Sequence, residues 1–208
     1  MARIMCYGED GLTLAAVTEH LGCLLKILKD DSNTDECLVL YRPSFGRNGG
    51  VTRASFGEFD AILATKKSVY LIESKWIRSR TTNQTIKLKK NQTRRHEIFE
   101  WIRSSWKKEN NWAQFREEYA EEFKDTFEKK PLASNTSKLG NNLEQILNLL
   151  LGYPKTIQHI VLAFYRDNRH EPTRVEDGAN KFILKKFPYK EFAVQEVFQL
   201  RLTLEKSE

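Results

Sequence analysis

The chain has 208 residues, of which 40% are hydrophobic and 30% charged, and its formal net charge is +6 at pH 7. This length suits one domain with a real core, so we expect a single domain over residues 1–208. No apolar run approaches the roughly 20 residues that a membrane-spanning helix needs, and no hydrophobic segment of secretory length opens the chain. With three cysteines and no CxxC pair, these features exclude a membrane-spanning protein and favour an intracellular, cytoplasmic one.

The positive charge is local. From Ser74 to Lys108 the chain has eleven Lys and Arg residues and two Glu residues, so this stretch carries +9 and the rest of the chain −3. A concentrated positive field suggests a polyanionic partner, because contacts to phosphates release counterions and steer encounter. A charge run is also typical of a solvated helix face, so the charge alone does not decide for nucleic acid.

The first third of the chain predicts a helix, a strand and a loop, in that order. Helical spacing of apolar residues predicts an amphipathic helix over residues 12–29. Residues 36–43 predict a strand that Pro43 stops. The Gly-rich, basic residues 44–57 lack the GKS or GKT ending of a phosphate-binding P-loop. We expect them to form a hairpin turn or flexible loop, which could lie against a DNA backbone.

The remainder alternates helices and strands. After the hairpin described below, the sequence predicts a basic helix at about 85–107, a helix with an acidic outer face at 112–127, a loop at about 131–140 and a helix at 141–152. A strand at 157–165 follows, and then further strands or a short helix at 181–187 and 197–205. Strands that come before, between and after helices indicate a mixed α/β fold with helices packed on a sheet.

Residues 57–76, GEFDAILATKKSVYLIESKW, read as two short apolar strands joined by a turn at Thr65–Ser68. In this register, residues whose numbers sum to 133 lie opposite each other, so Asp60 lies opposite Glu73. The Cβ atoms of directly opposed residues are about 4.5–5.5 Å apart, and like charges there are destabilising. A hard divalent cation such as Mg²⁺ or Mn²⁺ would neutralise the pair, because it prefers carboxylate oxygens and keeps waters for chemistry.

Lys75 points the same way from its strand as Glu73 and could orient a metal-held water or offset charge on a phosphoryl oxygen. A plainer alternative is a cross-strand salt bridge from Glu58 to Lys75, with both acidic residues on a wet outer face. Against it, the predicted face also carries Ile62, Val69 and Leu71. The opposite face is predicted core and carries Phe59, Ala61, Leu63, Tyr70, Ile72 and Trp76.

This hairpin resembles the PD-(D/E)XK nuclease superfamily, which includes restriction endonucleases, Holliday-junction resolvases and DNA repair nucleases. The match is an Asp near the start of one strand, a short hairpin, and an apolar strand ending in Glu73-Ser74-Lys75. The resemblance implies Asp60 and Glu73 as metal ligands and Lys75 as the catalytic lysine. Glu19 is similar to an acidic residue on the first helix of resolvase-like members, and Gln92 to an accessory polar residue on the following helix. The Pro that precedes the Asp in the family is absent here, since Phe59 stands in its place.

The resemblance covers roughly residues 12–100 and the 157–165 strand. It implies a restriction endonuclease-like mixed β-sheet flanked by helices, with the helices of 108–152 as an insertion. It also implies a metal-dependent DNA endonuclease of the restriction, repair or junction-resolving type, and a junction resolvase would act as a symmetric homodimer. The alternatives are a nucleic-acid-binding module of nuclease-like fold that does not cut, and an interaction scaffold that uses the aromatic helix 112–127.

Basic residues after the hairpin are the candidates for gripping the DNA backbone. They cannot all point one way on a helix, so a subset would contact phosphates. These candidates are Arg78, Arg80, Lys87, Lys89, Lys90 and Arg94, with Arg95 beside them. The four histidines have no paired metal spacing, and Trp101, Trp106 and Trp112 could stack on bases but at helical spacing are more typical of core.

Overall fold

A computed structural model describes residues 2–43, 58–77, 85–108, 111–128, 131–166, 171–179, 181–189 and 197–202. The predicted Gly-rich loop at 44–57 lies outside the described residues, and so do Arg78 and Arg80. Within the described part of the chain, no single helix is long and apolar enough to cross a membrane.

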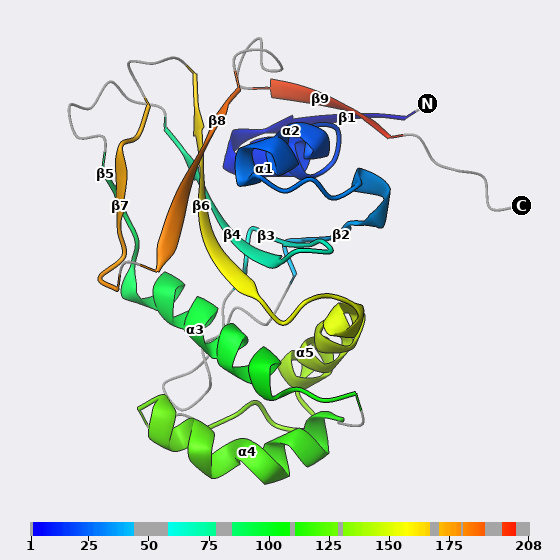
Figure 1. Cartoon of the computed structure of the whole chain (residues 1–208), viewed down its shortest axis with the longest axis vertical. Coiled ribbons are helices and arrows are strands. Elements are labelled where there is room, and N and C mark those ends of the chain that lie inside the picture. Colours follow the sequence, from blue (N-terminus) through cyan, green and yellow to red (C-terminus); the bar gives the residue numbers. More distant parts are fainter. Residues whose placement is uncertain are drawn as a thin grey trace, which may run out of the picture.

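A mixed sheet of five strands occupies the centre of the described structure (Figure 1). In sheet order its strands are β2 (Leu38–Tyr41), β3 (Ala61–Ala64), β4 (Val69–Trp76), β6 (Ile157–Tyr165) and β8 (Phe182–Pro188). Strands β2, β3 and β4 pair antiparallel, whereas β4, β6 and β8 pair parallel. The parallel pairing of β4 with β6 requires a crossover, which the intervening helices provide. The predicted mixed α/β fold is confirmed.

The β3–β4 hairpin has the predicted register. Ala61 pairs with Ile72 and Ile62 with Leu71, so the paired residue numbers sum to 133. The Thr65 N–H donates to the Ser68 carbonyl oxygen at 2.9 Å. The Thr65 hydroxyl oxygen accepts from the Ser68 N–H at 3.1 Å. A threonine side chain that satisfies turn amides in this way fixes the turn, and the turn fixes the register.

Helices cover both faces of the sheet. They are α1 (Gly8–Val17), α2 (Leu21–Leu28), α3 (Lys90–Ser105), α4 (Trp112–Thr126) and α5 (Lys138–Leu149), followed by a short 3-10 turn at Leu150–Gly152. Figure 1 shows α1 and α2 on one side of the sheet and α3, α4 and α5 on the other. The acidic outer face predicted for 112–127 is confirmed, since Glu117, Glu118, Glu121, Glu122 and Asp125 are exposed.

The prediction of one helix over 12–29 is wrong. The chain forms two helices, α1 and α2, whose axes differ by 85°. The break follows Thr18, whose hydroxyl donates to the Leu14 carbonyl oxygen at 2.6 Å. Such a bond competes with the helical backbone hydrogen bonds, which favours a bend. The bend lets Leu12 of α1 and Leu24 of α2 pack in the same cluster against the sheet.

Two small two-stranded sheets complete the fold. Strand β5 (Thr85–Lys87) pairs parallel with β7 (Arg174–Glu176), so the predicted helix at 85–107 begins only at Lys90. Ile86 of β5 is buried in a cluster with Val161 and Ala163, which favours the strand over the first helical turn. Strand β1 (Ala2–Tyr7) pairs antiparallel with β9 (Val197–Leu202), and Figure 1 shows this ribbon beside α1 and α2. A strand at residues 2–7 is not predicted from the sequence.

The hairpin is buried on both faces. Ala61, Leu63, Tyr70 and Ile72 pack with α1 and α2, whereas the face that carries Ile62, Val69 and Leu71 packs with α3, α4 and α5. The wet outer face of the plainer alternative is therefore absent from this part of the hairpin.

The placement of Phe59 with Ala61 is wrong. Phe59 packs on the α3 side, with its ring centroid 5.4 Å from that of Phe99. Residue 59 precedes β3, so the strict alternation of a regular strand does not apply to it. The helices of 108–152 share this cluster through Trp112, Phe115 and Leu143, and the buried Trp106 and Trp112 fit the core interpretation rather than base stacking.

Candidate active site

Charged side chains meet at the end of the β3–β4 hairpin, beside the first turns of α1 and α3. Asp60 lies directly before β3, and its carboxylate accepts a hydrogen bond from the Ser74 N–H at 2.7 Å. Ser74 follows Glu73 in β4, so the Asp60 carboxylate reaches the strand that carries Glu73 and Lys75. The hairpin register alone brings these three predicted residues together.

Glu73 is the most enclosed acidic side chain of this group, with 2% of its surface exposed. Its Oε1 accepts from Lys75 Nζ at 2.9 Å and from the Gln92 side-chain amide, and its Oε2 forms an ion pair with Arg95. A buried carboxylate is costly unless it is paired and hydrogen-bonded. Two cations and an amide meet that requirement here.

Gln92 reaches Glu73 because its amide is held at both ends. Its Oε1 accepts from the Lys89 N–H at 2.8 Å, which satisfies an amide at the start of α3. This bond turns the Nε2 group toward Glu73. The structure therefore places the predicted accessory residue in contact with a predicted metal ligand.

Lys75 lies between two carboxylates. Its Nζ is 2.9 Å from Glu73 Oε1 and 4.0 Å from Glu9 Oε1, and it donates to the Ser74 carbonyl oxygen at 2.5 Å. The alternative salt bridge from Glu58 to Lys75 is not formed. Glu58 instead pairs with Arg42 at 3.0 Å.

Glu9 is a site residue that the sequence analysis missed. It lies in the first turn of α1, and its Oε2 accepts from the Trp76 N–H at 2.7 Å. The Thr13 hydroxyl, which lies 2.8 Å from the Glu9 carbonyl oxygen and 2.7 Å from Ser74 Oγ, ties α1 to β4. An acidic residue at the start of a helix was the available signal. The predicted helix began at residue 12, which left Glu9 outside it.

Glu19 does not join these residues. It is exposed in the turn that follows α1, at the opposite end of that helix from Glu9. Glu9 rather than Glu19 is therefore the acidic residue of α1 that lies near Lys75. We call Glu9, Asp60, Glu73, Lys75, Gln92 and Arg95 the Glu73 cluster.

Burial, and after it the negative charge of Glu73, raise the pKa of Asp60 to about 7. The Ser74 N–H and the Lys75 ammonium act against this rise. The two carboxylates thus share a poorly solvated space in which their joint ionisation is unfavourable. A cation between them would remove that cost.

The donor chemistry fits a hard divalent cation. The side-chain ligands available are the carboxylate oxygens of Asp60 and Glu73, with Glu9 nearby, and Mg²⁺ is commonly held by one or two carboxylates together with waters. Among the described residues, no three His, Cys, Asp or Glu side chains converge as a ready-made metal cage. An ion held by Asp60 and Glu73 would have to take its other ligands from water or substrate.

The phosphate-contact candidates fall into two groups. Lys87, Lys89 and Lys90 are exposed near the start of α3, with Lys87 3.4 Å from Glu176 and Lys90 3.7 Å from Glu128. Arg94 is instead engaged within the protein, because its guanidinium donates to Glu128 at 2.6 Å and to the Phe127 carbonyl oxygen at 2.7 Å. Arg94 thus ties the end of α4 to α3, and its predicted phosphate contact is not supported.

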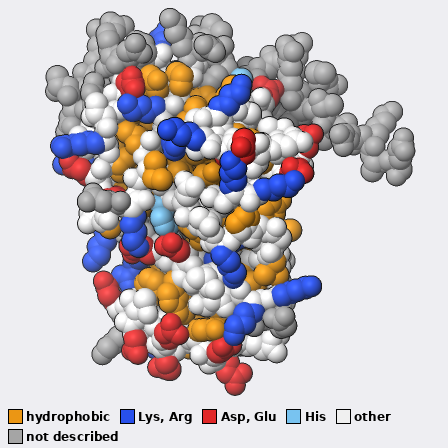
Figure 2. Space-filling model, viewed as in Figure 1, with side chains coloured by type: hydrophobic (Ala, Val, Ile, Leu, Met, Phe, Trp, Pro, Cys, Tyr) orange, Lys and Arg blue, Asp and Glu red, His pale blue; other side chains and the backbone are white. Residues whose placement is uncertain are grey.

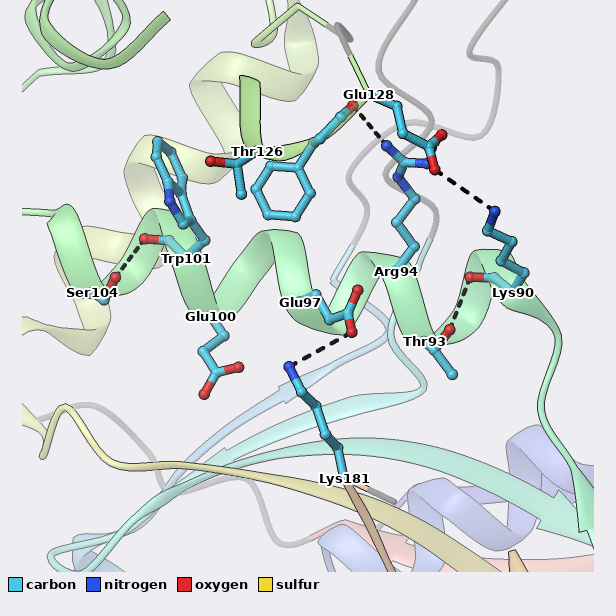
Figure 3. A pocket seen from close by; sticks show the side chains of 11 residues that line it. Lys90, Thr93, Arg94, Glu97, Glu100, Trp101, Ser104, Thr126, Glu128 and Lys181 are labelled. Atoms are coloured by element: carbon cyan, nitrogen blue, oxygen red, sulfur yellow. Dashed lines mark hydrogen bonds and ion pairs between the residues drawn. The ribbon is translucent and has the colours of Figure 1, made fainter. Parts of the chain in front are cut away.

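A groove of about 670 Å³ runs along the outer side of α3, where Arg94 lies (Figure 3). Its cations lie near carboxylates: Arg94 pairs with Glu128, Lys181 lies 3.6 Å from Glu97, and Lys90, exposed at the end of the groove nearest the start of α3, lies 3.7 Å from Glu128. Figure 2 shows basic and acidic side chains interspersed over the face of the molecule in view. The groove therefore lacks the uncompensated positive charge of a phosphate-binding site.

Comparisons of the chain with protein-family models, with curated proteins and with solved structures found no match. The chemistry of the Glu73 cluster is therefore the basis for assigning a function.

Proposed function

We propose that the protein is a metal-dependent endonuclease that hydrolyses phosphodiester bonds in DNA, with an α/β fold of the restriction endonuclease-like type. The observation that supports this most strongly is the meeting of Asp60, Glu73 and Lys75 at the end of one hairpin. The contact from Gln92 on the following helix and the approach of Glu9 from the preceding helix add to it. These are the groups that the resemblance to PD-(D/E)XK nucleases implies, with Glu9 in place of Glu19.

Asp60 and Glu73 would hold Mg²⁺ or Mn²⁺, which when bound supplies an activated water and stabilises charge on a phosphoryl oxygen. The Lys75 ammonium, held beside Glu73, would orient that water and offset the negative charge of the transition state. Gln92 would keep the Glu73 carboxylate in a fixed orientation, because its own amide is anchored to the start of α3. Glu9 would hold the end of β4 in place through the Trp76 N–H.

DNA would approach from the start of α3. Lys87, Lys89 and Lys90 are exposed there, within a few residues of Gln92. Contacts from such lysines to the backbone would give affinity without sequence preference. They would therefore position the duplex for cleavage rather than choose the site that is cut.

One observation favours a second candidate, a nucleic-acid-binding module that does not cut. Both oxygens of Glu73 are already engaged by side chains of the protein itself. If these contacts are permanent, only one lone-pair position, on Oε2 beside the Arg95 guanidinium, is left on Glu73 for a ligand. The two candidates differ in whether bound DNA is hydrolysed.

The experiment compares the parent with Asp60→Asn, Glu73→Gln and Lys75→Ala on linear, supercoiled, single-stranded and four-way-junction DNA, with RNA alongside. Each is incubated with Mg²⁺, with Mn²⁺ and with EDTA. We expect cleavage by the parent that requires metal, and a loss of about 100-fold or more in each variant, because each removes a group that acts on the transition state.

The matched control is Asp10→Asn, which removes a carboxylate next to Glu9 on the same helix. Asp10 is exposed and pairs with Arg42 outside the Glu73 cluster, so this variant should cut at the parent rate. Binding without cleavage by the parent would support the second candidate. Variants that cut as fast as the parent would refute the catalytic proposal.

A further inference from the structure

Arg95 uses only part of its hydrogen-bonding capacity in the Glu73 cluster. Its guanidinium forms an ion pair with Glu73 Oε2, and the side chains of Arg95 and Glu73 are 13% and 3% exposed. The guanidinium carbon lies 5.8 Å from the ring centroid of Phe59. The Arg95 Nε is buried and has no hydrogen-bond partner among the described residues. A guanidinium offers five N–H donors, so this one has capacity for an acceptor-rich ligand.

The position of Arg95 differs from that of its neighbour in sequence. Arg94 points to the outer side of α3, where its guanidinium donates to Glu128 and to the Phe127 carbonyl oxygen at the end of α4. Its Nε, like that of Arg95, is buried and has no partner among the described residues, so the two arginines differ in what their terminal nitrogens contact. Arg95 points inward to a carboxylate that a divalent cation would also bind. A metal ion at Glu73 Oε2 and a guanidinium on the same oxygen would repel each other strongly at such short range. The two cations therefore compete for one ligand.

The net charge of the Glu73 cluster suggests that Arg95 has a second, anionic partner besides Glu73. The Glu73 cluster holds the carboxylates of Glu9, Asp60 and Glu73 and the cations of Lys75 and Arg95, so its formal charge is −1 when all five groups are ionised. A bound divalent cation would bring the charge to +1, which one phosphodiester group neutralises. Without Arg95, the metal-loaded cluster would be neutral and would attract the phosphate less.

We propose that Arg95 is the built-in counterion of Glu73, which a divalent cation displaces, and that the displaced guanidinium then binds the scissile phosphodiester. This inference rests on the proposed function. The planar fork of a guanidinium matches the oxygens of a phosphate, and the Phe59 ring beside it supports the side chain once it leaves Glu73. Arg95 would thus lower the affinity for metal alone and raise the affinity for DNA.

The first test measures metal binding without DNA. Thermal stability is followed as Mn²⁺ is titrated into the parent, Arg95→Gln, Arg95→Lys and Asp60→Asn. If Arg95 is paired with Glu73 in about 90% of molecules, only about a tenth of the protein can bind metal at any moment. Arg95→Gln removes this competition and should lower the Mn²⁺ concentration at the midpoint of the titration about 10-fold. Arg95→Lys keeps the charge and should have a midpoint closer to that of the parent.

Arg94→Gln is the matched control for the titration. It removes the same charge from the adjacent position of α3, and its Mn²⁺ midpoint should equal that of the parent. Any shared loss of thermal stability in the two variants reports on packing. A midpoint shift in Arg95→Gln alone reports on competition for Glu73.

The second test measures DNA binding at saturating Ca²⁺, a hard cation that takes oxygen ligands. Arg95→Gln should bind a short duplex about 10-fold or more weakly, since a charge-assisted hydrogen bond to phosphate is lost. Arg95→Lys should also weaken binding, because an ammonium lacks the bidentate fork. Tighter metal binding together with weaker DNA binding is a combination that a purely structural ion pair does not produce.

The possible results separate the two proposals. If Mn²⁺ stabilises the parent and not Asp60→Asn, the metal site of the proposed function stands, and the Mn²⁺ midpoint and the DNA affinity of Arg95→Gln decide the inference. An unchanged or higher midpoint, or unchanged DNA affinity, would overturn the role of Arg95. If Mn²⁺ fails to stabilise the parent, the proposed function and the inference both fall.

Discussion

At the scale of single residues, two buried histidines lie against each other beside the Glu73 cluster, and one of them, His96, follows Arg95 directly in the sequence. His96 follows Arg95 on α3, and its Nδ1 lies 3.2 Å from Nδ1 of His159 on β6. Two protonated rings would each present an N–H there, so at least one ring is neutral. His159 Nε2 lies 3.2 Å from Glu100 Oε2, which fits a His159 that donates to Glu100 and accepts from His96. This assignment leaves His96 Nε2 as the acceptor that has no partner among the described residues.

The histidine pair makes stability depend on pH. Burial lowers the pKa of His96 well below its ordinary value, and the charges of His159 and Arg95 act in the same direction. Burial also lowers the pKa of His159, against the opposing effect of Glu100. The folded state then binds fewer protons than the unfolded state. The contribution of these two neutral histidines to the free energy of unfolding is therefore fully present above about pH 6.5, the ordinary pKa of histidine in an unfolded chain. It is lost as the pH falls below that value, by up to about 1.4 kcal/mol per pH unit for each histidine.

Urea unfolding at pH 7.5, 6.5 and 5.5 checks this expectation. His96→Phe places an apolar ring among Phe59 and Phe182 and should reduce the pH slope, whatever it does to the stability at pH 7.5. His20→Gln, which lies at the start of α2, serves as the control. An equal slope in the parent and in His96→Phe would contradict the assignment.

Asp60 gives a second prediction at this scale. In EDTA, Asp60→Asn should keep or raise the thermal stability, because asparagine can still accept from the Ser74 N–H while one of two repelling charges is removed. Thermal unfolding of the metal-free protein measures the effect. A clear loss of stability would show instead that the Asp60 charge is needed for structure, as in an ordinary salt-bridge network.

At the scale of elements, α4 and α5 meet at a glycine. A Cβ atom on Gly140 would lie 2.6 Å from Trp112 Cδ1 and 2.8 Å from the Ser134 carbonyl oxygen. Trp112 cannot easily move away, since its Nε1 donates to the Ala133 carbonyl oxygen at 3.0 Å. The close approach of the two helices therefore requires glycine at position 140.

Gly140→Ala should destabilise the protein by about 1–3 kcal/mol through overpacking, although alanine is the better helix former. Gly22→Ala in α2 is the matched control, because its Cβ would meet only Thr34 Cγ2 at 4.0 Å. That variant should hold or raise stability by up to about 1 kcal/mol. Chemical denaturation of both measures the contrast, and a stabilising Gly140→Ala would disprove the packing explanation.

The elements differ in how far the sequence predicts them. The β3–β4 hairpin was predictable in register, because its alternation and its Thr65 turn are local features. Asp60, Glu73 and Lys75 followed from that register. Strand β1 was not predictable in this way, because it is completed by β9 at the far end of the chain. Arg95 was hidden in a run of similar charges, and only the packing of α3 separates it from Arg94.

At the scale of the whole molecule, β4 is the strand that links the central sheet, the two main core clusters and the Glu73 cluster. It pairs with β3 on one side and with β6 on the other, and its two faces contribute to the two main core clusters. Its carboxyl-terminal end carries Glu73 and Lys75, where α1 and α3 both reach it. The mixed α/β architecture expected from the order of the elements thus explains why residues from three regions of the sequence meet there.

The position of β4 also has a consequence for the order of folding. The loop between β3 and β4 has four residues, whereas the segment between β4 and β6 contains α3, α4 and α5. Contacts between distant residues form late, because closing a long loop costs more conformational entropy. The early hairpin would hold Asp60 and Glu73 close together before Gln92 and Arg95 arrive on α3. A nascent chain that ends after β4 therefore carries the paired carboxylates without the helix that neutralises them.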